Sequence, residues 1–238
     1  MKLLLISNST MAGEIYLDYP KYEIQKFLGK KPVTALFIPY AAVTFSYDEY
    51  CRKVEERFSE VGHHITGVHT FANPKRAVEE AEAIVVGGGN TWQLVRLLHQ
   101  NELMEPIRRK VAGGTPFIGW SAGANIACPT LRTTNDMPIV NPLRFECLSL
   151  VPFQINPHYL DANAQEHAGE TREQRIEEFV ELNPDVYVAG LREGTIFRLE
   201  NDILELIGER SCRIFKKGEA PAELAAGSNF SFLLGKQA

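Results

Sequence analysis

The sequence lacks the residues and segments that mark secreted, metal-binding and membrane-spanning proteins. Its few cysteines are widely separated, with no C-x-x-C pair and no histidine at metal-ligand spacing; they are Cys51, Cys128, Cys147 and Cys212. This spacing predicts reduced thiols in a cytoplasmic protein, without a disulfide framework or a zinc site. The apolar run at residues 3–6 is too short for a signal peptide or a membrane span, so we interpret it as a buried strand.

The sequence also has no block of positive charge. Its 25 basic and 30 acidic residues give a formal net charge of -5 and are spread along the chain. A phosphate backbone is bound by clustered lysines and arginines, so we expect no nucleic-acid partner, and the short apolar runs predict no membrane partner. With 238 residues, 45% of them hydrophobic, the chain is expected to form one domain over residues 1–238, as a monomer or a homodimer.

Short apolar runs alternate with longer amphipathic stretches through the first half of the chain. This alternation predicts an α/β fold, a three-layer sandwich in which helices cover both faces of a mostly parallel sheet. The expected strands are at residues 2–7, 33–39, 64–69, 83–87 and 115–119, and the expected helices are at 46–61, 91–112 and 170–182.

The second half has a looser pattern. Five prolines between positions 129 and 157 predict an extended, turn-rich passage, with a short strand at 148–151. Further strands are expected near 186–190, 195–199, 203–207 and 212–216, the last three of them as an antiparallel meander that forms a small antiparallel C-terminal part.

A nucleophile motif lies between a predicted strand and a helix start rich in small residues. Residues 119–123 read Gly-Trp-Ser-Ala-Gly, and the glycines of such a G-x-S-x-G turn allow the close packing that lifts the serine hydroxyl out of the sheet edge. Ser121 is therefore the predicted nucleophile, and the amide of Ala122 is expected to face a developing oxyanion. The alternative interpretation is that Ser121 is only a helix N-cap.

A second glycine cluster, at 87–89, also follows a predicted strand and precedes a helix. The carboxyl ends of neighbouring parallel strands share one crevice, so the amide of Gly88 or Gly89 can complete an oxyanion hole beside Ser121. A phosphate-binding loop is the competing interpretation. However, the dinucleotide fingerprint fails at Trp92, and the lysine of a P-loop is absent.

A serine nucleophile needs a general base, and the chain offers six histidines. His158 is the preferred base because it follows Pro157 in the turn-rich passage, where a loop side chain can reach over a sheet edge. The other histidines are interpreted as ordinary surface or structural residues; they are His63, His64, His69, His99 and His167.

The carboxylate that orients the histidine has two candidates. Glu193 follows a predicted strand and precedes a glycine, whereas Asp136 lies in a polar segment that is also typical of a turn. Glu193 is preferred, and Asp136 is kept as the alternative acid. The resulting order of serine, histidine and acid differs from that of α/β-hydrolases, in which the histidine comes last.

Five motifs along the chain add a more specific signal. They are Val-Val-Gly-Gly-Gly-Asn-Thr at 85–91, Gly-Trp-Ser-Ala-Gly-Ala-Asn at 119–125, Thr-Thr-Asn-Asp-Met-Pro-Ile at 133–139, Gln-Ile-Asn-Pro-His at 154–158 and Gly-Glu-Thr-Arg-Glu-Gln-Arg-Ile at 169–176. Together they resemble the peptidase E family of α-aspartyl dipeptidases. Members of this family are serine peptidases with a flavodoxin-like sheet and a class I glutamine amidotransferase-like fold.

The resemblance implies a cytoplasmic serine exopeptidase that needs no metal or cofactor and cleaves dipeptides with an N-terminal aspartate. In this interpretation Ser121, His158 and Glu193 are the catalytic residues. A small peptide substrate of this kind needs a cation for its aspartate carboxylate, and an arginine can bind a carboxylate bidentately. The candidates for substrate binding are Arg172, which is preferred, Arg175 and Asn90.

Two other functions are compatible with the same residues. A cyanophycinase-like peptidase of the same serine branch would act on β-linked or longer aspartyl chains. A binding protein on the amidotransferase-like scaffold would have lost turnover. The presence of serine, histidine and acid together argues against the second alternative.

Overall fold

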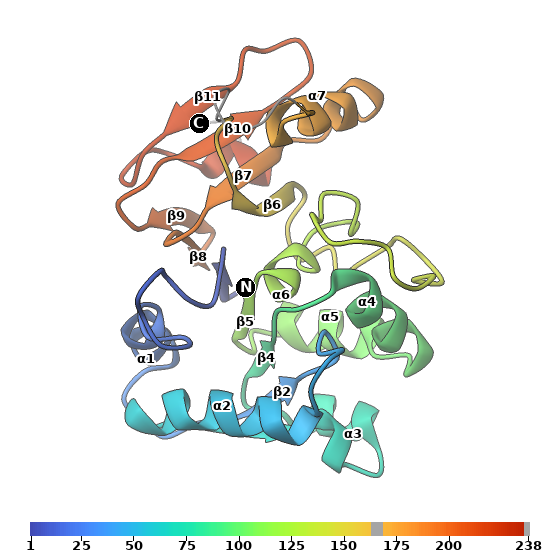
Figure 1. Ribbon diagram of the computed structural model, residues 1–238. Helices are drawn as coiled ribbons and strands as arrows, with labels where there is room; N and C mark the ends of the chain where they lie inside the picture. The colour runs from blue at the N-terminus through green and yellow to red at the C-terminus, as the bar shows by residue number, and fades with distance from the viewer. Residues whose placement is uncertain (163–168, 236–238) are drawn as a thin grey trace.

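The computed structural model describes residues 1–162 and 169–235, so His167 lies outside the described residues. The strands form two sheets. The larger sheet has the strand order β3-β2-β4-β5-β1-β8-β9, and the smaller sheet has the order β11-β10-β7-β6. Figure 1 shows the smaller sheet at the top of the view, beside helix α7, with the larger sheet below it.

The larger sheet is parallel except at one edge. Its parallel strands are β1 (Leu3–Ile6), β2 (Thr34–Ile38), β3 (His64–Gly67), β4 (Ile84–Val86) and β5 (Phe117–Trp120). Strands β8 (Ile196–Glu200) and β9 (Ile203–Ile207) extend it in antiparallel pairing. The α/β architecture with a mostly parallel sheet is therefore confirmed. Strand β3 is shorter than predicted, because a 3₁₀ turn at Val68–Thr70 follows it.

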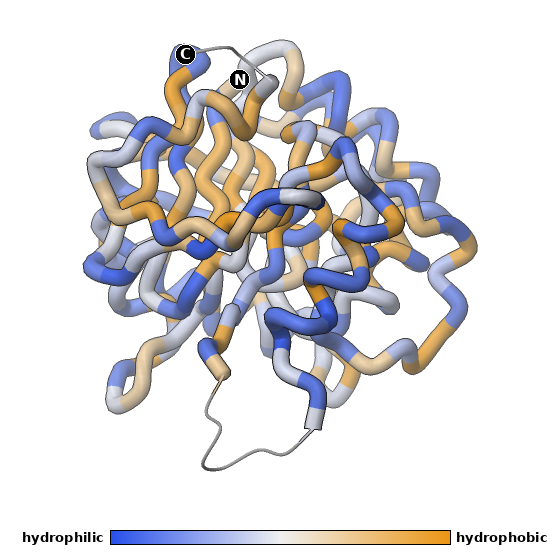
Figure 2. Tube along the Cα trace, turned by 90° about the horizontal axis from the view of Figure 1, so that it is seen from above, coloured by the Kyte–Doolittle hydropathy of each residue, from blue (hydrophilic) through white to orange (hydrophobic). Residues whose placement is uncertain are grey.

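Helices cover both faces of this sheet because successive strand residues point to opposite sides. Leu4 and Ile6 pack on the side of α1 (Lys21–Leu28) and α2 (Tyr47–Glu60). The opposite face, with Leu3 and Leu5, packs with α3 (Pro74–Glu80), α4 (Thr91–Gln100), α5 (Met104–Ala112) and α6 (Ala122–Asn125). Figure 2 shows the resulting hydrophobic strands in the middle and hydrophilic segments around them.

Side chains fix where several of these helices begin. A residue just before the helix accepts a hydrogen bond from a backbone amide of the first turn, which satisfies a donor that the helix itself leaves unpaired. The capping residues are Ser46 for α2, Asn73 for α3, Asn90 for α4 and Thr171 for α7. Helices α1 and α3 were not predicted from the sequence.

The smaller sheet joins four strands from the second half of the chain. Strands β6 (Gln154–Tyr159) and β7 (Val188–Arg192) are parallel, and β10 (Cys212–Phe215) and β11 (Ala222–Leu224) continue the sheet in antiparallel pairing. Ile155 and Leu191 belong to the same core as α4 and α5, whereas α7 (Arg172–Leu182) packs on the other face of the sheet. A 3₁₀ turn, Ser231–Leu234, follows β11.

Four predictions about the elements were wrong. The expected helix at 91–112 is two helices, interrupted near Glu102, whose φ of 53° is incompatible with a continuous right-handed helix. Residues 148–151 form no strand, and His158 lies in β6 rather than in a loop. The expected antiparallel meander is divided, because β8 and β9 join the larger sheet while β10 pairs with β7.

A buried arginine holds the end of β7, directly before Glu193. The side chain of Arg192 is 11% exposed and donates to both oxygens of Asp161, at 2.9 and 2.5 Å, and to both oxygens of Glu223, at 2.9 and 2.8 Å. Asp161 follows β6, and Glu223 lies in β11. Arg192 therefore ties together the segments that carry His158 and Glu193.

We expect acid to destabilise the protein partly through Glu223. The hydrogen bonds from Arg192 lower the pKa of Glu223 to about 2 in the folded protein, compared with 4.5 for an ordinary glutamate. The stabilisation from this carboxylate is therefore complete above the pKa of the unfolded state and is lost as the pH falls from 4.5 towards about 2. The Glu223→Gln variant should accordingly show a thermal midpoint that falls less steeply than that of the wild type over this range.

At neutral pH the same variant should lose only about 1 kcal/mol of unfolding free energy, because Glu223 is 40% exposed and solvent screens the pair. Glu209→Gln is the matched control, since the described residues offer Glu209 no salt-bridge partner. Equal pH slopes for Glu223→Gln and the wild type in thermal melts would contradict the expectation.

Candidate active site

Ser121 lies on a sharp turn between β5 and α6. Its backbone has φ 54° and ψ −113°, a strained conformation for a residue with a side chain. A Cβ atom on Gly119 would lie 2.3 Å from the carbonyl oxygen of Gly123, and one on Gly123 would lie 2.1 Å from that of Val86. Both glycines are therefore required by close backbone packing, as the G-x-S-x-G motif predicted.

His158 approaches Ser121 from the other sheet. It lies near the end of β6, and its Nε2 atom is 2.9 Å from Ser121 Oγ. Its backbone also has a positive φ, of 52°, at an irregularity in the pairing of β6 with β7. Two hydrogen bonds hold this backbone: His158 N donates to Ser7 Oγ at 3.0 Å, and Asn135 Nδ2 donates to the carbonyl of Pro157 at 2.6 Å.

Glu193 completes a chain of three side chains. It directly follows β7, and its Oε1 atom is 2.7 Å from His158 Nδ1. The next residue, Gly194, donates its amide to Asn8 Oδ1 at 2.9 Å, which fixes the turn after the strand. The structure therefore places the preferred acid on the imidazole nitrogen that faces away from the serine, an arrangement that can support acyl transfer.

Asp136, the alternative acid, has a different set of partners. Its Oδ2 atom accepts from Thr91 N at 2.7 Å, from Thr91 Oγ1 at 2.6 Å and from Thr134 Oγ1 at 3.1 Å. It is not hydrogen-bonded to His158 within the described part of the chain. Asp136 instead joins the polar segment around it to the start of α4, so the alternative assignment is not supported.

Backbone amides lie beside Ser121 where an oxyanion would form. Ala122 is the first residue of α6, so its amide has no acceptor within the helix. A Cβ atom on Gly88 would lie 3.0 Å from Ser121 Cβ, which places the glycine loop against the nucleophile. Across the residues that the structure describes, the amides of Gly88 and Gly89 have no hydrogen-bond acceptor, so both remain available to a substrate.

Tyr50 orients this glycine loop. Its hydroxyl donates to the carbonyl of Gly88 at 2.9 Å and accepts from Trp120 Nε1 at 3.2 Å. The carbonyl and the amide of one peptide unit point in opposite directions, so Tyr50 directs the amide of Gly89 away from itself. Burial raises the pKa of Tyr50 to about 12, which keeps this donor protonated.

A cavity of about 330 Å³ opens beside the three side chains, and we call it the arginine cavity. Its lining consists of Thr91, Ser121, Thr134, Asn135, Asp136, Pro157, His158, Leu160, Arg172 and Glu193. Arg172 is the first residue of α7, and its Nη1 atom is buried without an acceptor in the described part of the chain. Burial and the neighbouring Arg175 lower the pKa of Arg172, but an arginine remains charged.

The other two predicted substrate-binding residues do not line this cavity. Arg175 is exposed, and its closest recorded partner is Glu170, at 3.5 Å. Asn90 caps α4 through Gln93 N and donates to the carbonyl of Met137 at 3.0 Å, so its side chain has a structural role. Thr91, Thr134 and Asn135 also line the cavity and were not predicted to do so, although two of the motifs quoted above contain them.

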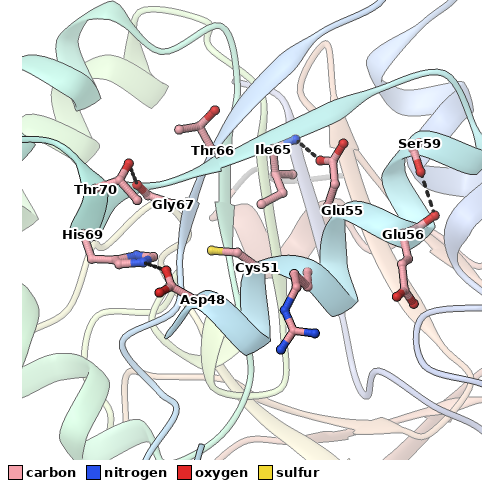
Figure 3. Close-up of a pocket in the computed structure, with 11 residues that line it drawn as sticks. Asp48, Cys51, Glu55, Glu56, Ser59, Ile65, Thr66, Gly67, His69 and Thr70 are labelled. Carbon is pink, nitrogen blue, oxygen red and sulfur yellow. Dashed lines mark hydrogen bonds and ion pairs between the residues drawn. The ribbon is translucent and has the colours of Figure 1, made fainter. Parts of the chain in front are cut away.

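A larger cavity, of about 580 Å³, lies between α2 and β3 and contains no residue of this arrangement. Figure 3 shows Cys51 and His69 there, with Asp48 facing the imidazole. Asp48 is 2.9 Å from His69 Nε2, and Glu55 accepts from Ile65 N at 2.7 Å, so both carboxylates have partners. Burial and the nearby Asp48 and Glu55 raise the pKa of Cys51 to about 11, which leaves it a weak nucleophile.

Two candidate features of other protein classes are missing from the described residues. They contain no group of three or more histidines, cysteines, aspartates or glutamates arranged to hold a metal ion. No helix among them is both long enough and apolar enough to cross a membrane.

Comparisons with known proteins match the chain to one family. The model of peptidase family S51 matches residues 3–207. Peptidase E from Nostoc sp. is 50% identical over 233 residues, which cover 98% of this chain and 96% of that protein. Peptidase E from Salmonella typhimurium is 46% identical over 230 residues, which cover 97% of this chain and 100% of that protein.

A solved structure of a peptidase from an acI-B1 actinobacterium has a similar fold. Its TM-score is 0.68 at 20% identity, and the match covers 97% of this chain and 96% of that one.

The roles of Glu193 and Asp136 can be distinguished by measuring how fast a fluorophosphonate probe labels Ser121. We expect Glu193→Gln to slow labelling at least about 100-fold, because the imidazole loses the anion that orients it and stabilises its protonated form. Asp136→Asn should slow labelling less than about 10-fold, because the Asp136 carboxylate is hydrogen-bonded to Thr91 and Thr134 and, in the described part of the chain, not to the imidazole. The reverse ranking, in variants with wild-type circular dichroism spectra, would make Asp136 the acid.

Proposed function

Because the chain belongs to peptidase family S51 and is therefore a peptidase, we propose that it is a serine exopeptidase that hydrolyses dipeptides with an N-terminal aspartate. The observation that carries the proposal is the position of the half-buried Arg172, with its buried Nη1 atom, in the cavity that also contains Ser121 and His158. An unpaired guanidinium beside a nucleophile favours a substrate with a carboxylate on its acyl side.

The proposed reaction is acyl transfer through Ser121. His158 removes the proton from Ser121 Oγ as the hydroxyl attacks the peptide carbonyl, and Glu193 stabilises the charged imidazole. The amide of Ala122 and that of Gly88 or Gly89 stabilise the oxyanion. His158 then protonates the leaving amine, and a water molecule activated by His158 releases free aspartate.

This chemistry needs no metal ion or cofactor, because the imidazole activates the nucleophile and backbone amides stabilise the developing charge. We further propose that the protein acts in the cytoplasm on small peptides, as a monomer or a homodimer. The four cysteines carry no disulfide in the structure, which is compatible with a reducing compartment.

The first test is the release of free aspartate from Asp-Leu, with β-Asp-Leu and Ala-Leu as comparison substrates. We expect the wild type to hydrolyse Asp-Leu, and Ser121→Ala to reduce kcat by about 10³-fold or more. Preferential cleavage of β-Asp-Leu would instead favour a cyanophycinase-like activity. No cleavage of any of the three peptides would contradict the proposed function.

A second test concerns the recognition of the aspartate side chain. Arg172→Met should reduce kcat/KM for Asp-Leu by about 100-fold, because the substrate carboxylate loses a charge-assisted partner in a half-buried site. The loss for Asn-Leu, which has no charge at this position, should be much smaller. Arg175→Met is the matched control on the same helix and should leave both values close to those of the wild type. An equal loss of kcat/KM for Asp-Leu and Asn-Leu would show that Arg172 does not recognise the charge of the aspartate side chain.

A further inference from the structure

A second cavity meets the arginine cavity at the nucleophile. It has a volume of about 400 Å³, and Ser121 and His158 are the two residues that line both cavities. Its walls carry several aromatic rings and one lysine, and we call it the aromatic cavity; these residues are Tyr16, Phe45, Tyr50, Trp120 and Lys53.

The two cavities divide the space on either side of the scissile bond. In the proposed function, the aspartyl part of the substrate lies in the arginine cavity, with its carbonyl carbon at Ser121 Oγ. The leaving residue must then continue past His158, which protonates its amine. The aromatic cavity adjoins both Ser121 and His158, and Arg172 is not among the residues that line it.

We propose that the aromatic cavity binds the residue that follows aspartate, and that Lys53 binds the C-terminal carboxylate of that residue. This inference rests on the proposed function, because it assigns the second half of the same substrate. In a dipeptide the C-terminal carboxylate belongs to the second residue, so its contact with Lys53 explains why dipeptides are selected.

The walls of the aromatic cavity suit an apolar side chain. Tyr16 and Tyr50 share a hydrogen bond of 3.0 Å between their hydroxyls, and Trp120 Nε1 donates to Tyr50. These polar groups are hydrogen-bonded to one another, so a ligand in the cavity does not need to supply hydrogen-bond partners for them. Phe45 packs edge-on against Tyr50, with ring centroids 5.2 Å apart, and extends the apolar wall towards Lys53.

Lys53 is positioned to exchange a weak partner for a substrate carboxylate. Its Nζ atom lies 5.1 Å from the centroid of the Phe45 ring and 3.4 Å from Glu49 Oε1, one turn earlier on α2. Both side chains of this pair are substantially exposed, at 51% and 40%, and exposed pairs of this kind contribute little. Lys53 is the only lysine or arginine among the described residues that line the aromatic cavity.

The experiment compares Asp-Leu with Asp-Leu-amide and with aspartic acid p-nitroanilide, whose leaving groups have no carboxylate. The wild type should prefer Asp-Leu over Asp-Leu-amide. In Lys53→Met, KM for Asp-Leu should rise about tenfold, with a much smaller change in kcat, because the lost contact lies far from the reacting atoms. The preference for Asp-Leu over Asp-Leu-amide should be smaller in Lys53→Met than in the wild type by the same factor.

Two controls make the result specific. Lys26→Met removes one positive charge from α1, lines neither cavity and should retain the wild-type ratio of the two activities. Lys53→Arg should keep most of the preference, since it retains the cation. The leaving group of the anilide has no carboxylate for Lys53, so Lys53→Met should lose about tenfold more activity on Asp-Leu than on the anilide.

The outcomes separate this inference from the proposed function. If the wild type cleaves Asp-Leu and Lys53→Met keeps the wild-type ratio of Asp-Leu to Asp-Leu-amide, the role of Lys53 is overturned while the aspartyl dipeptidase function stands. If the wild type cleaves neither substrate nor the anilide, both are overturned.

Discussion

The hydrogen bond between Ser121 and His158 joins two sheets, and the active-site arrangement depends on how these sheets are held together. Ser7, fully buried just after β1, makes the connection: its hydroxyl donates to the carbonyl of Leu191 in β7 at 2.7 Å and accepts from the amide of His158 in β6 at 3.0 Å. One buried hydroxyl thus fixes the larger sheet against both strands that carry the base and the acid. Because its donor and its acceptor are both used, a shift of either sheet would leave a buried polar group unpaired, which costs about 1–3 kcal/mol.

Strain at the nucleophile and at the base is a second property of this junction. Ser121 and His158 both have positive φ, a conformation that costs on the order of 1–3 kcal/mol for a residue with a side chain. Hydrogen bonds hold both backbones: the amide of Ser121 donates to Ile6 and its carbonyl accepts from the amide of Asn125, whereas the peptide unit between Pro157 and His158 is held by the side chains of Ser7 and Asn135. The strain aims the two side chains at each other across the gap between the sheets, so the packed core stabilises a geometry that the local backbone does not favour.

The parts of the site that follow from local sequence could be predicted, and those that depend on distant pairing could not. Strand β5, Gly119, Ser121 and Gly123 lie within a few residues of one another, and close backbone packing explains why these residue types occur there. Strand β6 was missed because Pro157 argues against a strand, yet β6 is at the edge of its sheet, where a missing amide donor is tolerated. Arg172 was preferred over Arg175, but both lie in the same Glu/Arg-rich segment, and it is the tertiary structure that places the first in the cavity and leaves the second exposed.

The Nη1 atom of Arg172 is buried without an acceptor among residues 1–162 and 169–235, which is unfavourable in the free protein, so Arg172 needs a rigid support. The start of α7 supplies it through a capping box, in which Thr171 and Gln174 each accept a hydrogen bond from the backbone amide of the other. Glu173 adds a second anchor, since it accepts from Arg213 of β10 at 2.8 Å. The helix start is therefore fixed by its neighbours on either side of Arg172, while the Nη1 donor of Arg172 meets no acceptor in the described part of the chain. Stability is given up at this one position, and a ligand that supplies the missing acceptor recovers it as binding energy.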